Sequence, residues 1–482
     1  MGLAISCAAA QGSECVFSLY YHARIKSLQM PVRGNRPSLH RVVTVFEHVL
    51  KDGLGDTLEE QEENAKKFME CNEDGITLPK VKQPLDVDDP RARWFRENFK
   101  LWFLGLKEEH ITRADVEQWI SWALTGRHRE ELQDASTNDE SGYLNDLLEQ
   151  GMALVEARRG LPFPKKVELT KVERSRRRMM LLSLDPVRVR MHPLGHYVLM
   201  KSLNLLHLRY LKLRYGLKVF KCGRISYFYY APRDWTEEEA TKGNKPLPLL
   251  FLHGLGVGHV QYCWSLAQFL APGGKPAKRP FIMPIQPWIA NDIFSHDFLA
   301  PWDAIEASET IRGILRRHDI TRVNIVSHSK GTITHTWIIK NLADVIVRSC
   351  FVDPVPFELW NPYLCYRFMY KKPETGIEIG LRYFVARELG TAFTLSRHFN
   401  WSTNVLLPHE DFTNGHDPNL YRFYIAGDDS VFSAPHIRAY LKRNGIVDNV
   451  HYYEGLPHGA LIMTPNSATP EFVAWLDEPM AA

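Results

Sequence analysis

The second half of the chain alternates between short apolar runs and segments with helical periodicity. Apolar runs of strand length, rich in β-branched and aromatic residues, predict strands near 224–231, 247–252, 280–285, 322–327, 347–352, 419–426 and 448–453. Between them, apolar residues at helical spacing predict helices over 301–317, 331–342, 433–443 and 469–477. Strands that alternate with helices build a mostly parallel, doubly wound sheet, so we predict one α/β domain over residues 216–482.

Residues 1–215 show a mostly helical pattern instead. Apolar spacing predicts helices over 38–52, 60–71, 92–105 and 112–125, the last opened by a capping box from Thr112 to Asp115. We expect a poorly ordered arm over 1–36, an acidic loop over 127–147 and a solvated basic linker over 158–190. Residues 192–222 interleave apolar residues with Lys and Arg, which predicts an amphipathic basic helix docked on the α/β domain.

The strand over 322–327 ends abruptly at the run Ser327-His328-Ser329-Lys330-Gly331, and a helix follows. A serine on a tight strand-to-helix turn, with small residues two positions before and after it, is typical of a nucleophile elbow. Such a turn lifts the hydroxyl toward a base, which a serine needs in order to react at neutral pH. Ser327 stands where the usual pattern has glycine, and His328 is expected to point away from Ser329. An ordinary buried strand with a polar end is the alternative.

Partner groups for a nucleophilic serine stand in loops that follow three other predicted strands. Upstream, an apolar run ends at His253-Gly254-Leu255-Gly256, and the main-chain N–H groups of Leu255 and Lys330 are the predicted donors to an oxyanion. Downstream, one strand ends at Asp428 and Asp429, and the last strand is followed by His458. The chain order is therefore serine, aspartate, histidine.

These motifs resemble those of the α/β-hydrolase superfamily, which contains esterases and lipases, over roughly residues 220–480. The resemblance implies the α/β-hydrolase fold, with Ser329 as nucleophile, His458 as general base and acid, and Asp429 as the group that orients the imidazole. Asp429 fits the family's acid loop better than Asp428, which remains the alternative. Asp353 follows the strand after the elbow, where some members carry the acid, and we expect it to cap a turn instead.

An insertion over 355–418, rich in aromatic residues, interrupts the alternation of strands and helices. In the α/β-hydrolase superfamily an insertion at this place forms a lid over the acyl pocket. Aromatic side chains there exclude water and bind apolar groups, or they pack the core of the insertion itself. Together with the helical N-terminal extension, this insertion resembles little-characterised fungal members of the superfamily.

The resemblance predicts a serine hydrolase that cleaves carboxylic esters with an apolar acyl or alcohol moiety through an acyl-enzyme, without metal or organic cofactor. An acyltransferase with the same triad and a catalytically silent binding protein are the alternatives, because the same acyl-enzyme precedes hydrolysis and transfer. The substrate is therefore expected to be a small apolar ester.

Charge and cysteine content limit the expected partners and the expected cellular compartment. A formal net charge of +3 over 482 residues implies no polyelectrolyte partner, and the basic stretch lacks the fold or interleaved aromatics of a nucleic-acid site. Peripheral membrane contact through the basic 158–222 region is the alternative to a docked helix. Seven cysteines without Cys-x-x-Cys spacing predict a reducing, cytoplasmic setting. The N-terminus lacks the pattern of a secretory signal, although Met1-Gly2 begins a short myristoylation pattern.

Overall fold

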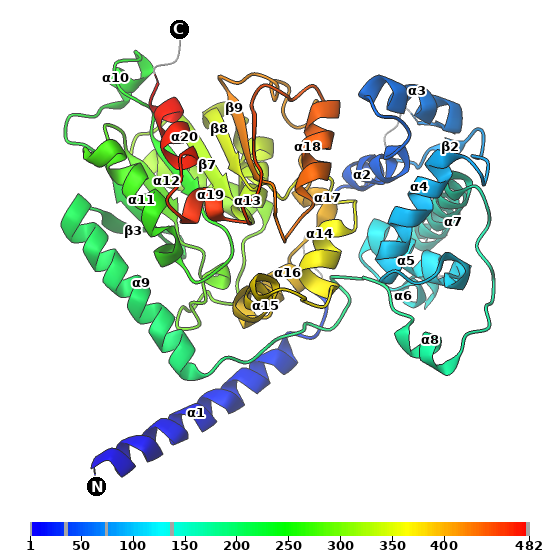
Figure 1. Cartoon of the computed structure of the whole chain (residues 1–482), viewed down its shortest axis with the longest axis horizontal. Coiled ribbons are helices and arrows are strands. Elements are labelled where there is room, and N and C mark those ends of the chain that lie inside the picture. Colours follow the sequence, from blue (N-terminus) through cyan, green and yellow to red (C-terminus); the bar gives the residue numbers. More distant parts are fainter. Residues whose placement is uncertain (1, 33–36, 73–75, 135–138, 479–482) are drawn as a thin grey trace.

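An eight-stranded sheet forms the centre of the computed structural model, which describes residues 2–32, 37–72, 76–134 and 139–478 (Figure 1). The spatial order of the strands is β10-β9-β8-β7-β5-β6-β4-β3. Their bounds are β3 (Lys218–Cys222), β4 (Ile225–Tyr230), β5 (Leu249–Leu252), β6 (Phe281–Pro284), β7 (Val323–His328), β8 (Ile346–Val352), β9 (Tyr421–Ala426) and β10 (Val450–Tyr453). Only the β3–β4 and β4–β6 pairs are antiparallel, so the predicted mostly parallel sheet is confirmed.

Helices cover both faces of the sheet, because successive strand side chains point to opposite sides. Leu249 and Phe251 of β5 pack with one set of helices, and Leu250 and Leu252 pack with the other. The first set is α9 (Leu194–Tyr215), α11 (Cys263–Leu270), α19 (Ala460–Met463) and α20 (Ala468–Asp477). The second contains α12 (Ala304–Arg317) and α13 (Gly331–Leu342), and α18 (Ala434–Arg443) packs against Phe423 and Ile425 of β9.

Short helices fill the segment between β8 and β9. They are α14 (Tyr363–Cys365), the π-helical turn η7 (Tyr366–Tyr370), α15 (Gly376–Leu381), the π-helical turn η8 (Arg382–Ala386), α16 (Leu389–Arg397) and α17 (Trp401–Asn404). In Figure 1 this segment lies below the carboxyl ends of the parallel strands. It is thus placed where ligands enter open α/β sheets.

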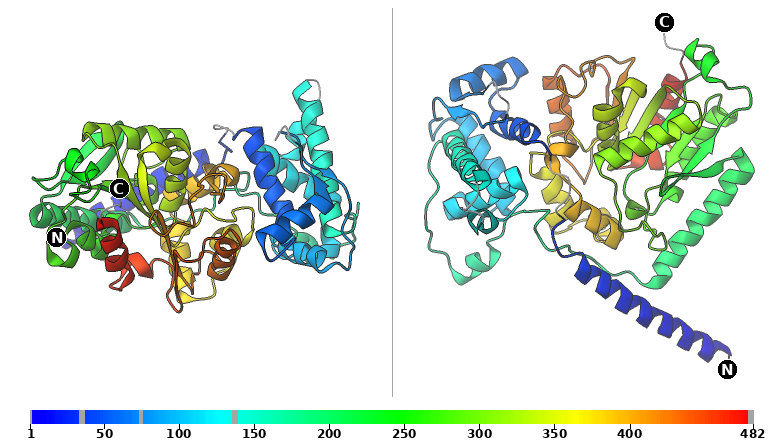
Figure 2. Two further views of the ribbon diagram at one scale, coloured as in Figure 1. Left: turned by 90° about the horizontal axis from the view of Figure 1, so that it is seen from above. Right: turned by 180° about the vertical axis from the view of Figure 1, so that it is seen from behind.

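The N-terminal helices form a cluster beside the sheet (Figure 2). They are α2 (Leu39–Lys51), α3 (Leu58–Phe68), α4 (Pro90–Phe99), α5 (Arg113–Thr125), α6 (Arg129–Asp134), α7 (Asp139–Arg159) and α8 (Lys171–Arg176), with a small antiparallel pair, β1 (Met69–Glu70) and β2 (Lys80–Val81). The capping box at Thr112 and Asp115 is present as predicted. Arg41 of α2 donates two hydrogen bonds to Asp411, which joins this cluster to the loop before β9.

The remaining elements are short. They are α10 (Glu237–Thr241) and the 3₁₀ turns η1 (Lys100–Phe103), η2 (Glu108–His110), η3 (His259–Tyr262), η4 (Pro272–Gly274), η5 (Pro287–Ile289) and η6 (Ala343–Val345). No helix in the part of the chain that the structure describes is both long and apolar enough to cross a bilayer.

Two N-terminal predictions are wrong. Residues 2–27 form the helix α1 (Gly2–Ser27) where a poorly ordered arm over 1–36 was expected, because Phe17 and Tyr21, one helical turn apart, pack on Tyr197 of α9. The expected loop over 127–147 contains α6 and the first part of α7, and residues 135–138 lie outside the described residues. Two buried leucines, Leu132 and Leu147, anchor these helices in the N-terminal core.

The basic segment also differs from its prediction as a solvated linker. Arg158 and Arg159 end α7 and are buried, and the Arg158 guanidinium donates to the carbonyl oxygens of Leu50, Arg91 and Asp52. The single helix predicted over 192–222 ends at Tyr215, because Gly216 takes a left-handed conformation with φ 73°. The chain then forms the edge strand β3, which the sequence did not predict.

Candidate active site

Ser329 sits on a strained turn between β7 and α13. Its φ is 51°, in the left-handed region that non-glycine residues seldom adopt. Two hydrogen bonds hold the turn: the Ser329 N–H donates to the Val352 carbonyl oxygen at 3.1 Å, and the Thr332 hydroxyl donates to the Ser329 carbonyl oxygen at 2.5 Å. A Cβ on Gly331 would lie 2.1 Å from the Leu252 carbonyl oxygen, so only glycine fits at that position.

Ser327, which replaces the usual first glycine of the elbow, is accommodated by a buried hydrogen-bonded chain. Its hydroxyl lies 2.8 Å from Nδ1 of His335, whose Nε2 lies 3.1 Å from the Ser349 hydroxyl. All three side chains are buried beneath the turn. Burial lowers the pKa of His335 to about 3, so its ring is neutral and can bridge two hydroxyl groups.

Loops from three strands bring Ser329, His458 and Asp429 together. The Ser329 Oγ lies 2.9 Å from Nε2 of His458, and Nδ1 of His458 lies 2.5 Å from Oδ2 of Asp429. The other Asp429 oxygen accepts the main-chain N–H groups of Val431 and Phe432 at 2.7 and 3.1 Å, which fixes the carboxylate. Asp428, the alternative acid, has an exposed side chain and is not hydrogen-bonded to His458.

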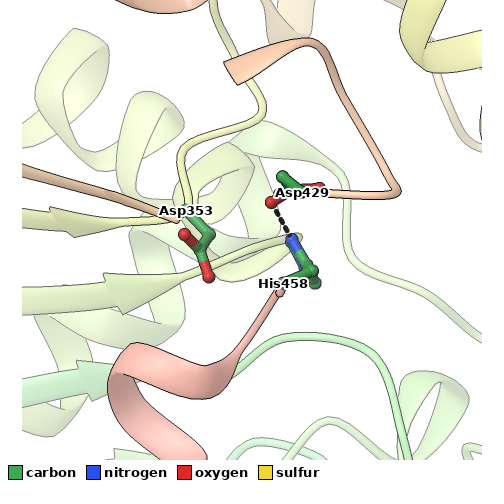
Figure 3. Close-up of side chains that lie close together, drawn as sticks. All are labelled: Asp353, Asp429 and His458. Carbon is green, nitrogen blue, oxygen red and sulfur yellow. Dashed lines mark hydrogen bonds and ion pairs between the residues drawn. The ribbon is translucent and has the colours of Figure 1, made fainter. Parts of the chain in front are cut away.

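Asp353 lies beside the Asp429–His458 pair (Figure 3). It is buried and does more than cap a turn, contrary to its prediction. One carboxylate oxygen accepts the N–H of Ala426 at 2.9 Å, and the other accepts the N–H of Gly459 at 2.7 Å. The side chain thereby ties the end of β8 to the end of β9 and to the loop that carries His458. Burial and the charge of Asp429 raise the pKa of Asp353 to about 6, against the opposing effect of His458.

Two carboxylates act on the His458 imidazole. Burial alone would lower the pKa of His458, but Asp429, which is hydrogen-bonded to it, and Asp353 outweigh that effect and raise the pKa to about 9. Ligand atoms of Asp353, Asp429 and His458 lie within 4.8 Å of one another, a spacing that could hold a metal ion. The Asp353 oxygens and the Asp429–His458 pair are already hydrogen-bonded, which favours a hydrogen-bonded network over a metal centre.

The two predicted oxyanion donors, the main-chain N–H groups of Leu255 and Lys330, take no part in the hydrogen bonds that the structure describes in their own loops. Gly254 donates its N–H to the Tyr262 hydroxyl at 2.8 Å, and Gly256 donates to Ile289 at 3.0 Å. Within the described ranges, no protein acceptor lies on the N–H of Leu255 or of Lys330. A Cβ on Gly254 would lie 2.9 Å from the Ser329 Cβ, so the loop that carries Leu255 lies against Ser329.

Behind this loop, His328 and Tyr262 form a pair that sequence reasoning found only in part. His328 is buried and its Nδ1 lies 2.9 Å from the Tyr262 hydroxyl, while the residue also contributes to the wall of the cavity beside Ser329. Burial lowers the pKa of His328 well below its usual value, so the ring is neutral. Tyr262 holds both His328 and the Gly254 N–H, and no motif in the sequence marked it.

Ser329 and His458 open into a cavity of about 150 Å³. Its wall is largely apolar and comes from the elbow, from the segment between β8 and β9, and from Leu182 of the N-terminal part. The side chains on the wall are Leu182, Leu255, Gln261, His328, Ser329, Lys330, Ile333, Val355, Leu359, Leu364, Cys365, Phe368, Met369, Leu381, Val385, Leu395, Phe399, Val431, His458 and Met463. The volume is similar to that of protein cavities that bind a benzene ring.

The aromatic side chains of the insertion contribute less to this wall than expected. Met369 lies on it, but the Tyr370 hydroxyl hydrogen-bonds to Asp185, Phe384 is 46% exposed, and Phe393 packs on His398. Aliphatic residues and Phe368 and Phe399 form the wall in their place.

Comparison with known proteins gives only distant similarities. No family model matches the sequence, and no curated protein matches it. Similar solved structures include naproxen esterase from Bacillus subtilis, with 12% identity and a TM-score of 0.38 over 57% of this chain and 96% of that one. Two others are an α/β hydrolase from a lagoon-sediment metagenome and 2-hydroxy-6-oxo-6-phenylhexa-2,4-dienoate hydrolase from Rhodococcus. Each has 13% identity and a TM-score of 0.36, over 54% of this chain and 97% of the other chain.

The fold can be assigned from the sheet of this chain itself, without these distant similarities. Six neighbouring strands, β10 to β6 in spatial order, run parallel, with helices on both faces and a serine on the sharp turn after β7. An acid follows β9 and a histidine follows β10. The chain has the α/β-hydrolase fold.

Proposed function

We propose that this protein is a serine hydrolase that cleaves carboxylic esters through an acyl-enzyme. The observation that carries the proposal is the hydrogen-bonded series Ser329–His458–Asp429, which opens into an apolar cavity. A serine with a base on its hydroxyl and an acid on the base is the arrangement that acyl transfer requires. The strained conformation of Ser329 supports the same role, because strained residues gather at functional sites.

The roles follow from the atoms in contact. With Asp429 on Nδ1, the His458 ring carries a proton there and leaves Nε2 free to take the proton of the Ser329 hydroxyl. Ser329 Oγ then attacks the ester carbonyl, and the N–H groups of Leu255 and Lys330 stabilise the negative charge on the carbonyl oxygen. His458 passes its proton to the leaving alkoxide, and a water molecule later attacks the acyl-enzyme with the same assistance.

The cavity wall favours an ester with an apolar acyl or alcohol moiety. Each buried methylene contributes about 0.8 kcal/mol, so an apolar chain of the right length binds well in such a space. The segment between β8 and β9 acts as a lid in this proposal, because it supplies much of the wall. We further propose residues 216–482 as the catalytic domain and residues 1–215 as an extension that closes the cavity through Leu182.

The test is covalent labelling of purified protein with a fluorophosphonate probe, followed by hydrolysis of p-nitrophenyl esters. Wild type should be labelled and active, and Ser329→Ala should lose both properties. Ser308→Ala is the matched control, because Ser308 is a buried serine on α12 that hydrogen-bonds only to its own helix. Undiminished labelling of Ser329→Ala would refute the proposal.

Two other outcomes correspond to the alternative functions. Ligand binding by a wild type that is neither labelled nor active on esters would indicate a silent binding protein. Faster release of the acyl group in the presence of a primary alcohol, with formation of the new ester, would indicate an acyltransferase, since the acyl-enzyme is common to both reactions.

A further inference from the structure

Lys330 is the only lysine among the cavity-wall residues that the structure describes, and, unlike His458, which is hydrogen-bonded to Asp429, it has no acidic partner. The residue is 7% exposed. No hydrogen bond or ion pair joins its ammonium group to any described residue, and its one recorded contact is the face of the Trp337 ring, 4.9 Å away. The wall contains no aspartate or glutamate that could neutralise it.

An unpaired ammonium on an almost fully buried side chain beside an apolar cavity is costly, and an aliphatic residue would fill this position without that cost. Burial lowers the pKa of Lys330 to about 8, with no acidic neighbour opposing the change, so the group still carries its charge at neutral pH. The face of Trp337 compensates in part. Of the remaining polar wall groups, Gln261 is already hydrogen-bonded to Leu255 and Val257. His328 is neutral, and its Nε2 has no hydrogen-bond partner among the described residues, so Lys330 is the wall cation without an acidic partner.

We propose that the Lys330 ammonium pairs with a carboxylate of the substrate, so that preferred substrates are half-esters whose apolar acyl chain ends in a free carboxylate. A carboxylate fits better than a phosphate, because a single cation without further free donors balances one negative charge. The inference rests on the proposed ester hydrolysis and defines the substrate class of that site. It concerns the Lys330 side chain, whereas oxyanion stabilisation uses its main chain.

The experiment compares p-nitrophenyl half-esters of dicarboxylic acids, from succinate to suberate, with the same esters capped by a methyl group at the distal carboxylate. The quantity measured is the ratio of kcat/KM for the charged ester to that for its neutral partner, which cancels general effects on the catalytic groups. Wild type should prefer the charged ester at one chain length. Lys330→Met, similar in shape without the charge, should lower the ratio by ~10- to 100-fold.

A ratio that Lys330→Met leaves unchanged, or a wild type that prefers every neutral partner, would overturn the inference while leaving the ester hydrolase in place. If Lys330→Met fails to fold, Lys330→Gln and the wild-type ratio at high and low salt give the same decision. Calorimetric titration of Ser329→Ala with the monoamide of the best dicarboxylic acid needs no turnover. It therefore detects the Lys330–carboxylate contact even if ester hydrolysis itself fails.

A second, independent feature is an apolar stripe along the outer face of α9. Five large side chains share it at intervals of four and three residues: Leu199, Leu203, Leu206, Tyr210 and Leu213. Their exposure reaches 65% at Leu206 and 78% at Leu213. The opposite face of α9, through Tyr197 and Leu211, packs on the body of the protein, and the helix runs along its edge (Figure 1).

The charges of α9 indicate what covers this stripe. The helix contains no acidic residue. Arg209 flanks the stripe on one side and Arg214 on the other, and neither forms an ion pair with a described residue. A second copy of the chain would bring like charges together, whereas an anionic lipid surface would pair with the cations and bury the leucines.

We infer that the outer face of α9 docks on the surface of an anionic membrane, without crossing it. Sedimentation with vesicles of equal parts phosphatidylcholine and phosphatidylserine should carry down wild type, and vesicles of phosphatidylcholine alone should carry down far less. Leu206→Glu should weaken binding by about tenfold or more. Ile305→Glu, at an exposed apolar position on α12, should bind as wild type does.

Equal sedimentation of wild type and Leu206→Glu would overturn the membrane inference. A dimer in solution that Leu206→Glu converts to a monomer would also overturn it, because the stripe would then be an interface between copies. Both variants are surface changes, and their thermal melting temperatures verify that they fold.

Discussion

Asp353→Asn should move the acidic limb of the pH profile toward neutral pH. If His458 is the general base, kcat/KM follows its neutral fraction and rises toward a plateau above its pKa of about 9. At pH 7 only ~1% of the enzyme would then have a neutral His458. Asp353 is charged across this range, since its pKa is about 6, and it favours the protonated imidazole.

The size of the shift follows from the spacing of the two groups. One ligand atom of each group lies within 4.8 Å of the other. At that upper limit, opposite charges attract by about 3.5 kcal/mol at an effective dielectric constant of ~20 and by about 0.9 kcal/mol in bulk water. These limits correspond to a change in the His458 pKa of ~2.5 and ~0.6 pH units. The rate at pH 7, as a fraction of the plateau, should therefore rise at least about fourfold in Asp353→Asn.

The assay is kcat/KM for a neutral p-nitrophenyl ester from pH 6 to 10, with the pH-dependent background subtracted. Asparagine can accept only one of the two N–H groups that Asp353 accepts, so the height of the plateau and the melting temperature should fall. The position of the limb is the informative quantity. Asp428→Asn removes an exposed charge that does not contact His458 and should leave the limb in place.

A folded Asp353→Asn enzyme with the wild-type limb would show that the Asp353 charge does not act on His458. A wild-type limb below pH 7 would refute the raised pKa itself, and with it the claim that the two carboxylates outweigh the effect of burial.

Three further predictions concern the same site. Asp429→Asn should lower kcat by ~10⁴-fold, the loss typical for a triad aspartate, because it disturbs the His458 tautomer. Asp428→Asn should lower kcat only slightly, and steady-state kinetics of both variants tests the difference. For neutral esters, kcat/KM should rise from acetyl to medium-length chains and then level off, because each buried methylene adds up to ~0.8 kcal/mol of binding free energy. A steady decline of kcat/KM from acetyl upward would show that the cavity is not the acyl pocket. Gly331→Ala should destabilise the fold by ~1–3 kcal/mol or more in thermal or urea denaturation, because its Cβ would meet the Leu252 carbonyl oxygen, whereas Gly380→Ala, with open space around it, should not.

The sheet was predictable from the sequence because its central strands are buried on both faces. Continuous apolar runs such as the one in β5 can form little else, and the seven predicted strands are all present. The loops that follow those strands meet at one edge of the sheet, so the candidate residues Ser329, Asp429 and His458 could be identified from their place after each run.

Features that depend on contacts with residues far away in the sequence were not predictable. The edge strand β3 exposes Lys218 and Lys221, so its sequence continues the basic pattern of α9, and only the antiparallel pairing with β4 reveals a strand. Asp353 before a proline matches an ordinary turn, because its two N–H partners are 73 and 106 residues away. Arg158 is similar, since a buried arginine that donates to carbonyl oxygens has no local pattern.

The active site joins parts of the sheet with different tendencies to open. Ser329 follows β7, which has strands on both sides, whereas His458 follows β10, an edge strand paired only with β9. Edge strands open locally at a lower free-energy cost than the core. Mild heating should therefore separate His458 from Ser329 before the sheet unfolds. Fluorophosphonate reactivity should then disappear while most of the circular dichroism signal remains. Hydrogen exchange should be fastest, among the parallel strands, in β10.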